Sequence, residues 1–421
     1  MATTEPALLD KPTTINMLHD ACELEHMLCV QYLYAAATLS HGGDPGVTTV
    51  RAALTEQWSQ QLSRIAVQEM YHLTLANNIL IALGAAPYLW RPNFPQPASR
   101  YSDINLPSTL TPFSQETVSR FLCWEKPEPD GWWDDFCAEC GRQAHTRLNL
   151  AMTASEERPY GSIAELYDQI KAAILGHPEW IDPASAARQV TSALIPLTPT
   201  LTPITTAEQA ARYIDIIVLE GEGAPDWQSD SHFAYFHQIA DQLDGLKQTQ
   251  PDFAPGWPTV ENPVYDPANT GGTLITDPAV RAVGVTFNEL YLLFVEMLVR
   301  LFTPDGQSTG QRQGLARVVT ALMPLGIKPL AALLTRLPAG AEHPGRYAGP
   351  AFELPQPQPT GPPATVDELA GRLLALAGRC RVLGLTDSGL DAGTQDALAT
   401  IAARLETLVP LFTPSTVELP A

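Results

Sequence analysis

The 421-residue sequence predicts an all-α protein, a four-helix bundle with long proline-rich loops and additional helices toward the C-terminal end. Apolar residues recur at intervals of three and four over several long windows, which is the period of one helix face. The 38 prolines gather between those windows, in the connecting loops. The first two windows are joined by a short loop, so their helices are expected to be antiparallel neighbours.

The first long helix is predicted over residues 13–40, where Thr13 or Thr14 can cap the N-terminus. Its apolar stripe is interrupted in the middle by Glu25. Burying a carboxylate is costly unless the group is hydrogen-bonded, ion-paired or bound to a metal. Glu25 is therefore expected either to accept a hydrogen bond from a tyrosine such as Tyr32 or to bind a metal.

The second helix is predicted over residues 48–83 and ends before Gly84-Ala-Ala-Pro87. Glu69 and His72 lie three positions apart on it and share a face that is otherwise apolar. A Glu-x-x-His pair directed into a bundle is a motif of carboxylate metal sites. Because the pair also arises often by chance, it needs partners on other helices.

The third core helix is predicted over residues 206–222, opened by the capping box Thr206-Ala-Glu-Gln209. Glu222 interrupts its apolar face, as Glu25 does on the first helix. Glu220 lies two positions away and points elsewhere unless the helix unwinds at the neighbouring glycines, a kind of irregularity that often marks a site.

The fourth core helix is predicted over residues 227–244, with His232 on its apolar face and His237 on an adjacent face. Each histidine alone is more typical of an ordinary core or surface residue than of a ligand. Together, however, the polar groups that interrupt four apolar stripes favour a metal site over a structural polar core. The candidate metal ligands are Glu25, Glu69, His72, Glu222 and His232, and the candidates for catalytic proton transfer are Glu220, Glu23 and His237.

The rest of the chain reads as further helices separated by irregular segments. The long insertion 87–205 is expected to contain helices at 115–124 and 162–175, an irregular segment from Glu125 to Gly141, and a strand or extended crossover from Val190 to Leu201. Later helices are predicted at 285–302, 314–336, 364–383 and 391–411. The predicted domains are a core with its insertion at 1–250, a helical extension packed on it at 251–360, and a C-terminal helical hairpin at 361–421.

Composition excludes some classes of partner. The net charge of −21 argues against nucleic acid and against an anionic membrane surface. The most apolar run, Leu290 to Phe302, is too short to span a bilayer and contains Glu296 and Arg300. A small-molecule substrate is the expected partner, and a homodimer is compatible with the sequence.

The six cysteines and the N-terminus indicate a cytoplasmic protein. The first residues do not show a basic region followed by an apolar one, so no secretory signal is expected. Cys22 and Cys29 lie on an apolar helix face and are expected to be core thiols. Cys137-Ala-Glu-Cys140 is a C-x-x-C without a second pair, which favours two reduced thiols in a loop over half a zinc site.

Several short motifs together resemble the ferritin-like family called iminophenyl-pyruvate dimer synthase. They are Glu23-Leu-Glu-His26 with Gln31-Tyr32-Leu33, Gln68-Glu-Met-Tyr-His-Leu-Thr-Leu-Ala-Asn-Asn78, Val218-Leu-Glu-Gly-Glu-Gly223 with Ser231-His-Phe233, and Ala348-Gly-Pro-Ala-Phe-Glu353. The resemblance covers roughly residues 14–360. This domain is part of bacterial enzymes that couple two tryptophan-derived imines in violacein and rebeccamycin-type biosynthesis.

The resemblance implies a ferritin-like core and oxidative chemistry on an aromatic amino-acid derivative in secondary metabolism. The carboxylate-rich donor set suits non-haem iron, with manganese as the alternative. A typical di-iron bundle carries a second Glu-x-x-His on its fourth helix, but Ser229 stands three positions before His232. A mononuclear site and a dinuclear site completed by Glu220, His237 or water both remain open. The alternative function is a ferritin-like scaffold or partner subunit without redox activity.

Overall fold

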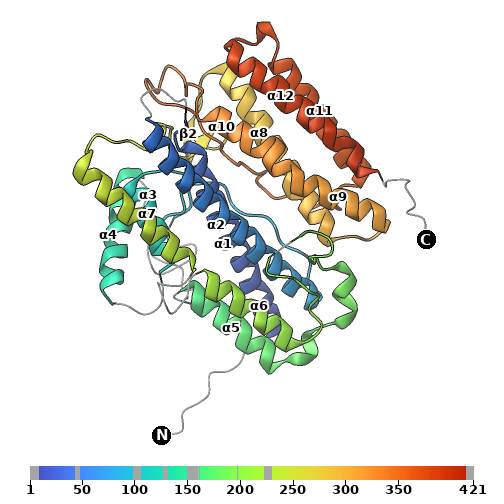
Figure 1. Ribbon diagram of the computed structural model, residues 1–421. Coiled ribbons are helices and arrows are strands. Elements are labelled where there is room, and N and C mark those ends of the chain that lie inside the picture. Colours follow the sequence, from blue (N-terminus) through green and yellow to red (C-terminus); the bar gives the residue numbers. More distant parts are fainter. Residues whose placement is uncertain are drawn as a thin grey trace.

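The computed structural model describes residues 9–413 apart from 43–47, 98–105, 127–130, 149–159, 161, 197 and 222–229. Figure 1 shows helices α1 to α7, coloured blue to yellow-green, on one side of the molecule and α8 to α12, coloured yellow to red, on the other. The described residues contain almost no strand, so the all-α prediction is confirmed. The strands β1 (Pro263–Val264) and β2 (Thr273–Leu274) form one short parallel pair.

The two longest helices form the centre of the fold. Helix α1 (Lys11–Thr38) packs along its neighbour α2 (Thr49–Ala82), as the short connection predicted. Asp10 caps α1 by accepting a hydrogen bond from the backbone N–H of Thr13, so the predicted caps Thr13 and Thr14 instead lie inside the helix. Most residues of α1 and of the second half of α2 are buried, so polar side chains that point between these parts are removed from water.

The other two sides of the bundle are built from shorter helices. Helix α3 (Gln115–Trp124) packs on α7 (His232–Thr249), and α5 (Ile163–Gly176) packs on α6 (Ala207–Glu220). Helices α6 and α7 both contact α2, and in Figure 1 they follow one another in a broken line. The bundle therefore has α3 and α5 on its third side and α6 and α7 on its fourth.

This arrangement corrects the sequence prediction. The segments predicted as the third and fourth core helices are both helical, but they lie in series on one side of the bundle. The amphipathic helices α3 and α5 fill the remaining side because each has an apolar face to bury. The capping box at Thr206 is confirmed, and α6 ends at Glu220 with Gly221 as its C-cap.

The insertion between α2 and α6 differs from the prediction in two places. Helix α4 (Gly131–Leu148) occupies much of the segment expected to be irregular. Residues 190–196 form turns and bends rather than a strand, and they follow two 3₁₀ helices, Pro178–Trp180 and Pro183–Arg188. Proline-rich sequence here produces short turns because proline supplies no backbone N–H for a ladder.

The C-terminal layer covers the outer side of the α1–α2 pair. It comprises α8 (Pro278–Phe302), α9 (Thr309–Leu322), α10 (Lys328–Leu334), α11 (Val366–Leu383) and α12 (Ala392–Leu408), with 3₁₀ turns at Thr386–Ser388 and Val409–Phe412. A π-helical turn, Met323–Ile327, joins α9 to α10. Helices α11 and α12 pack as the predicted hairpin, with the capping box at Thr365 confirmed, and α11 rests on α8. The predicted domain boundaries stay a prediction.

Two helical stretches of this layer, Pro278–Phe302 and Thr309–Leu334, are long and apolar enough to cross a bilayer by length and composition alone. The apolar run Leu290 to Phe302 is too short to span a bilayer, as predicted, but the whole helix α8 that contains it is long enough. In their most apolar windows, 56% and 44% of the residues are buried inside the protein, and core helices of soluble proteins also pass this test.

Candidate metal centre

One half of the candidate site is formed by α1 and α2. His72 places its Nδ1 atom 3.4 Å from Glu25 Oε2 and 3.4 Å from Glu69 Oε2. Glu25, Glu69 and His72 are all buried, with exposures of 1–2%. The pair on α2 faces inward because its i, i+3 spacing follows the buried stripe of the helix. These three side chains, which the sequence analysis selected, therefore meet at one point in the bundle.

The other half is formed by Glu69 together with residues from α3 and α7. His232, the first residue of α7, places Nδ1 3.2 Å from Glu69 Oε1 and 3.4 Å from Glu125 Oε2. Glu125 is the C-cap of α3, and both it and His232 are fully buried. In each of the two triads, one donor atom per residue lies within 4.8 Å of the others. Glu69 belongs to both triads and contributes one carboxylate oxygen to each.

The donor groups are oriented by neighbours that lie outside the two triads. Tyr167 on α5 donates a hydrogen bond to Glu25 Oε1 at 2.5 Å, and Tyr32 on α1 donates one to Glu125 Oε1. His72 Nε2 lies 3.2 Å from Glu220 Oε2, the last residue of α6. Donation from Nε2–H to this carboxylate leaves Nδ1 of a neutral His72 as an acceptor that faces the site.

Proton sharing within the cluster follows from its burial and its charges. Burial, together with the neighbouring charge of Glu125, raises the pKa of Glu69 to about 7. His232 acts in the opposite direction, but its effect is smaller. Burial also acts to raise the pKa of Glu25. The hydrogen bond and the charge of His72 outweigh the effect of burial, so the pKa of Glu25 lies below its ordinary value.

The two histidines are shifted in the opposite sense. Burial lowers the pKa of His232, but Glu125 and Glu69 together raise it to about 9. Burial is likewise outweighed at His72, whose pKa lies well above its ordinary value because of Glu220, Glu25 and Glu69. Without a metal, the imidazoles therefore hold protons that partly balance the buried carboxylates.

Several donor atoms at the centre lack hydrogen-bond partners among the described residues. Glu69 Oε1, Glu125 Oε2 and both ring nitrogens of His232 are buried without one: Nδ1 of His232 lies within ion-pairing distance of the two carboxylate oxygens, but neither contact has the geometry of a hydrogen bond. Buried polar groups in folded proteins are nearly always satisfied, and clustered exceptions are explained by an ion or water that completes the site. Carboxylates and imidazoles at this density fit one or two first-row metal ions. The residues present therefore fit the metal predicted from the sequence.

The remaining predicted site residues have different positions. Glu220 joins the site through His72, although only as an outer neighbour. Glu222 lies outside the described residues. Glu23 accepts a hydrogen bond from Tyr88 at 2.7 Å, and His237 pairs with Asp241 at 3.2 Å on α7. Neither Glu23 nor His237 belongs to the two triads, so their predicted catalytic roles are not supported by position.

Glu125 was missed by sequence reasoning because it falls in the segment expected to be irregular. The spacing of Glu125 from the apolar residues of α3 nevertheless indicated that its side chain points inward. Val118, Phe121, Leu122 and Glu125 lie at i, i+3, i+4 and i+7, so the buried stripe of α3 continues directly onto a carboxylate. Glu125 places a carboxylate beside His232, where a typical di-iron bundle has the glutamate that Ser229 replaces in this sequence.

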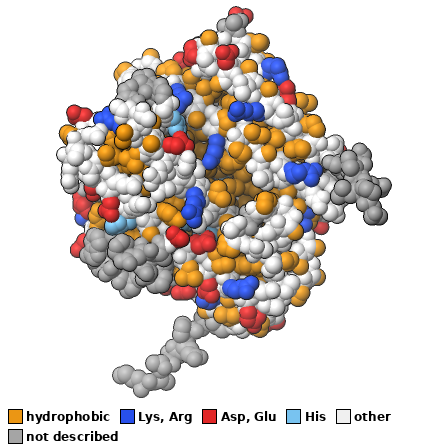
Figure 2. All heavy atoms as spheres, in the orientation of Figure 1, with side chains coloured by type: hydrophobic (Ala, Val, Ile, Leu, Met, Phe, Trp, Pro, Cys, Tyr) orange, Lys and Arg blue, Asp and Glu red, His pale blue; other side chains and the backbone are white. Residues whose placement is uncertain are grey.

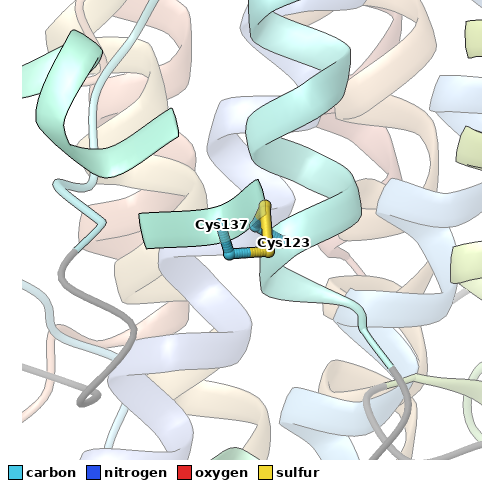
Figure 3. The surroundings of a disulfide bond; sticks show 2 residues. All are labelled: Cys123 and Cys137. Atoms are coloured by element: carbon cyan, nitrogen blue, oxygen red, sulfur yellow. A yellow bond between two sulfur atoms is a disulfide. The ribbon is translucent and has the colours of Figure 1, made fainter. Parts of the chain in front are cut away.

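A disulfide lies close to this ligand along the chain. Cys123 at the end of α3 is bonded to Cys137 of α4, and Figure 3 shows the bond joining the two helices. The predicted loop is wrong for both cysteines, because Cys137 and Cys140 lie in α4, and the predicted reduced state is wrong for Cys137, whereas Cys140 is a buried free thiol. The predicted core thiols Cys22 and Cys29 are buried and free. Disulfides are rare in reducing compartments, so this bond does not favour the predicted cytoplasmic location.

A family profile described as ferritin-like matches residues 18–241, which include every member of the two triads. The chain belongs to the ferritin-like family. Two curated relatives support the finer resemblance to iminophenyl-pyruvate dimer synthase. Dichlorochromopyrrolate synthase of Lentzea aerocolonigenes is 26% identical over 81% of this chain and 36% of its own length. The 2-imino-3-(indol-3-yl)propanoate dimerase of Chromobacterium violaceum is 27% identical over 89% of this chain and 37% of its own.

The chain thus spans little more than a third of the length of these two relatives. Among solved structures, it matches the crystal structure of a ferritin-like protein from Caulobacter vibrioides with 23% identity and a TM-score of 0.45, over 74% of this chain and 96% of that one.

Proposed function

We propose that the ferritin-like core holds a dinuclear non-haem iron centre and oxidises or oxidatively couples a small molecule derived from an aromatic amino acid. The observation that carries the proposal is the pair of buried triads that share Glu69. The donor set fits iron, with manganese as the alternative. The names of the two curated relatives support a substrate derived from an indole-containing amino acid.

The proposed ligands divide between the two positions. Glu25, Glu69 and His72 would hold one ion, and Glu69, Glu125 and His232 would hold the other. Iron bound there would supply one-electron redox chemistry and Lewis acidity. In ferritin-like bundles, single glutamates and Glu-x-x-His pairs on facing helices recur as the metal ligands.

Other side chains of the protein would support this chemistry. Glu220 fixes the tautomer and ring orientation of His72, and Tyr167 holds the carboxylate of Glu25. The Glu220 carboxylate is 25% exposed, whereas the side chain of His72 is 1% exposed, so Glu220 is the group that could exchange protons with solvent. Apolar packing around the centre excludes water and strengthens each electrostatic interaction within it.

The alternative of a scaffold without redox activity was motivated by the absence of a carboxylate before His232. The position of Glu125, 3.4 Å from His232, supports the metal centre over this alternative. The test is metal analysis of protein produced with iron in the medium, together with Glu69→Ala and the control Glu23→Ala. The proposal expects bound metal to be lost in Glu69→Ala and retained in Glu23→Ala. Equal metal contents in all three proteins would reject the centre.

A further inference from the structure

A groove separates α2 from the C-terminal layer, and no residue of the two triads lines it. The cavity measures about 310 Å³, and its walls include Leu33, Met70, Phe294, Leu298 and Met323, with Lys328 at the edge. Figure 2 shows a hollow lined by hydrophobic side chains near the middle of the face, between these two parts of the molecule. We call it the α2–α8 groove.

The groove and the metal centre lie on different sides of α2. Ser63, Met70 and Thr74 line the groove, whereas Glu69 and His72 point into the bundle. At 100° per residue, these two sets of positions are well separated around the helix. A ligand in the groove would therefore contact residues that the proposed chemistry does not use.

Lys328 gives the groove a specific chemical character. Among the described residues that line the 310 Å³ cavity, it is the one charged residue. Within the described part of the chain, no carboxylate or hydrogen-bond acceptor pairs with its ammonium group. Lys328 lies at the solvent edge, yet neighbouring atoms desolvate its amine and lower its pKa. An anion in the groove would offset that cost.

The size and lining of the groove narrow the class of ligand further. An apolar cavity of about 150 Å³ is enough to hold benzene, so about 310 Å³ accommodates two fused rings. The thioethers of Met70 and Met323 and the ring of Phe294 are favourable neighbours for an aromatic face. A single cation matches a singly charged carboxylate better than a phosphate dianion, which needs several donors.

The backbone beside Lys328 is also unusual. The π-helical turn Met323–Ile327 immediately precedes this lysine and contributes Met323 and Pro324 to the groove. π-helical turns are rare and occur frequently at functional sites. Here the turn places an apolar wall and the base of the lysine side chain next to each other. We propose that the α2–α8 groove binds a two-ring aromatic carboxylic acid, with its rings against the apolar walls and its carboxylate paired with Lys328.

The test is calorimetric titration of the full chain with 1-naphthaleneacetate, using the neutral 1-naphthaleneethanol as the comparison ligand. Lys328→Met keeps an apolar chain of similar shape and removes the charge. Lys247→Met, at an exposed position of α7, is the matched control. Ser63→Phe fills the groove from α2. Circular dichroism checks that each variant is folded.

We expect saturable binding of the acid to the wild type and to Lys247→Met. In Lys328→Met, binding should weaken roughly tenfold, because one charge-assisted hydrogen bond is lost, while the neutral alcohol binds the wild type and this variant equally. Binding of both ligands should disappear in Ser63→Phe. Absence of saturable binding, equal affinity of the acid for the wild type and Lys328→Met, or unchanged binding to folded Ser63→Phe would each overturn the proposal.

Discussion

Replacing Glu125 with Gln removes one charge from the centre while keeping the shape of the side chain. In metal-free protein, Glu125 Oε2 lies 3.4 Å from Nδ1 of His232 and both groups are fully buried. At an effective dielectric constant of about 20, opposite unit charges at this distance attract by roughly 5 kcal/mol. This attraction, with that of Glu69, raises the pKa of His232 to about 9 against the opposing effect of burial.

The net effect should be smaller than this gross attraction. Glu125 also raises the pKa of Glu69 by like-charge repulsion, so without Glu125 the carboxyl of Glu69 ionises more readily and replaces part of the lost attraction. We therefore expect the pKa of His232 to fall by about two units, roughly 3 kcal/mol. The site would also retain only the ion held by Glu25, Glu69 and His72.

The assay is an NMR pH titration of the imidazole resonances of chelator-treated protein, followed by metal analysis after reloading. Glu23→Gln is the matched control, because Glu23 is a buried acid on α1 that hydrogen-bonds Tyr88 and belongs to neither triad. It should leave the His232 titration unchanged. The reasoning would be refuted if Glu125→Gln titrated like the wild type, or if it still bound as much metal.

Three further outcomes follow from the same geometry. Glu220→Gln should weaken metal binding about 10- to 100-fold by removing the carboxylate behind His72, as measured by chelator competition, and unchanged affinity would count against that orientation. Apparent metal affinity should rise with pH up to about 9, because His232 is protonated below its pKa and must lose that proton to bind a metal. The rise should be roughly tenfold per pH unit for each proton displaced, and a flat profile from pH 6 to 9 would contradict this. The Cys123→Ala/Cys137→Ala variant should lose about 3 kcal/mol of unfolding free energy, because the disulfide closes a short loop in the unfolded chain. Equal urea midpoints of the wild type and this variant under oxidising conditions would contradict the prediction.

The periodicity of the sequence was sufficient to predict much of the fold and half of the candidate metal site. Glu25, Glu69 and His72 lie on long helices whose stripes continue for many turns, so their inward direction could be inferred from spacing alone. The same logic found His232, although it is the first residue of its helix rather than an internal one. Local pattern determines direction well where a helix is long and regular.

The rest of the site depends on tertiary packing that periodicity does not encode. Glu125 caps a short helix, and only the pairing of α3 with α7 brings it to His232. Glu220, the last residue of α6, reaches His72 because α6 packs against α2, a contact that the stripe of α6 does not encode. Likewise, the Cys123–Cys137 bond needs the fold of α4 to bring the two thiols together.

The most direct test of the dinuclear centre is anomalous scattering at the iron edge from crystals of the iron-loaded protein, with metal content measured on the same preparation. The proposed centre predicts two peaks in the bundle, one on each side of the Glu69 carboxylate, and about two ions per chain. Iron-loaded crystals with no peak beside Glu69, or with iron bound only at the surface, would contradict it.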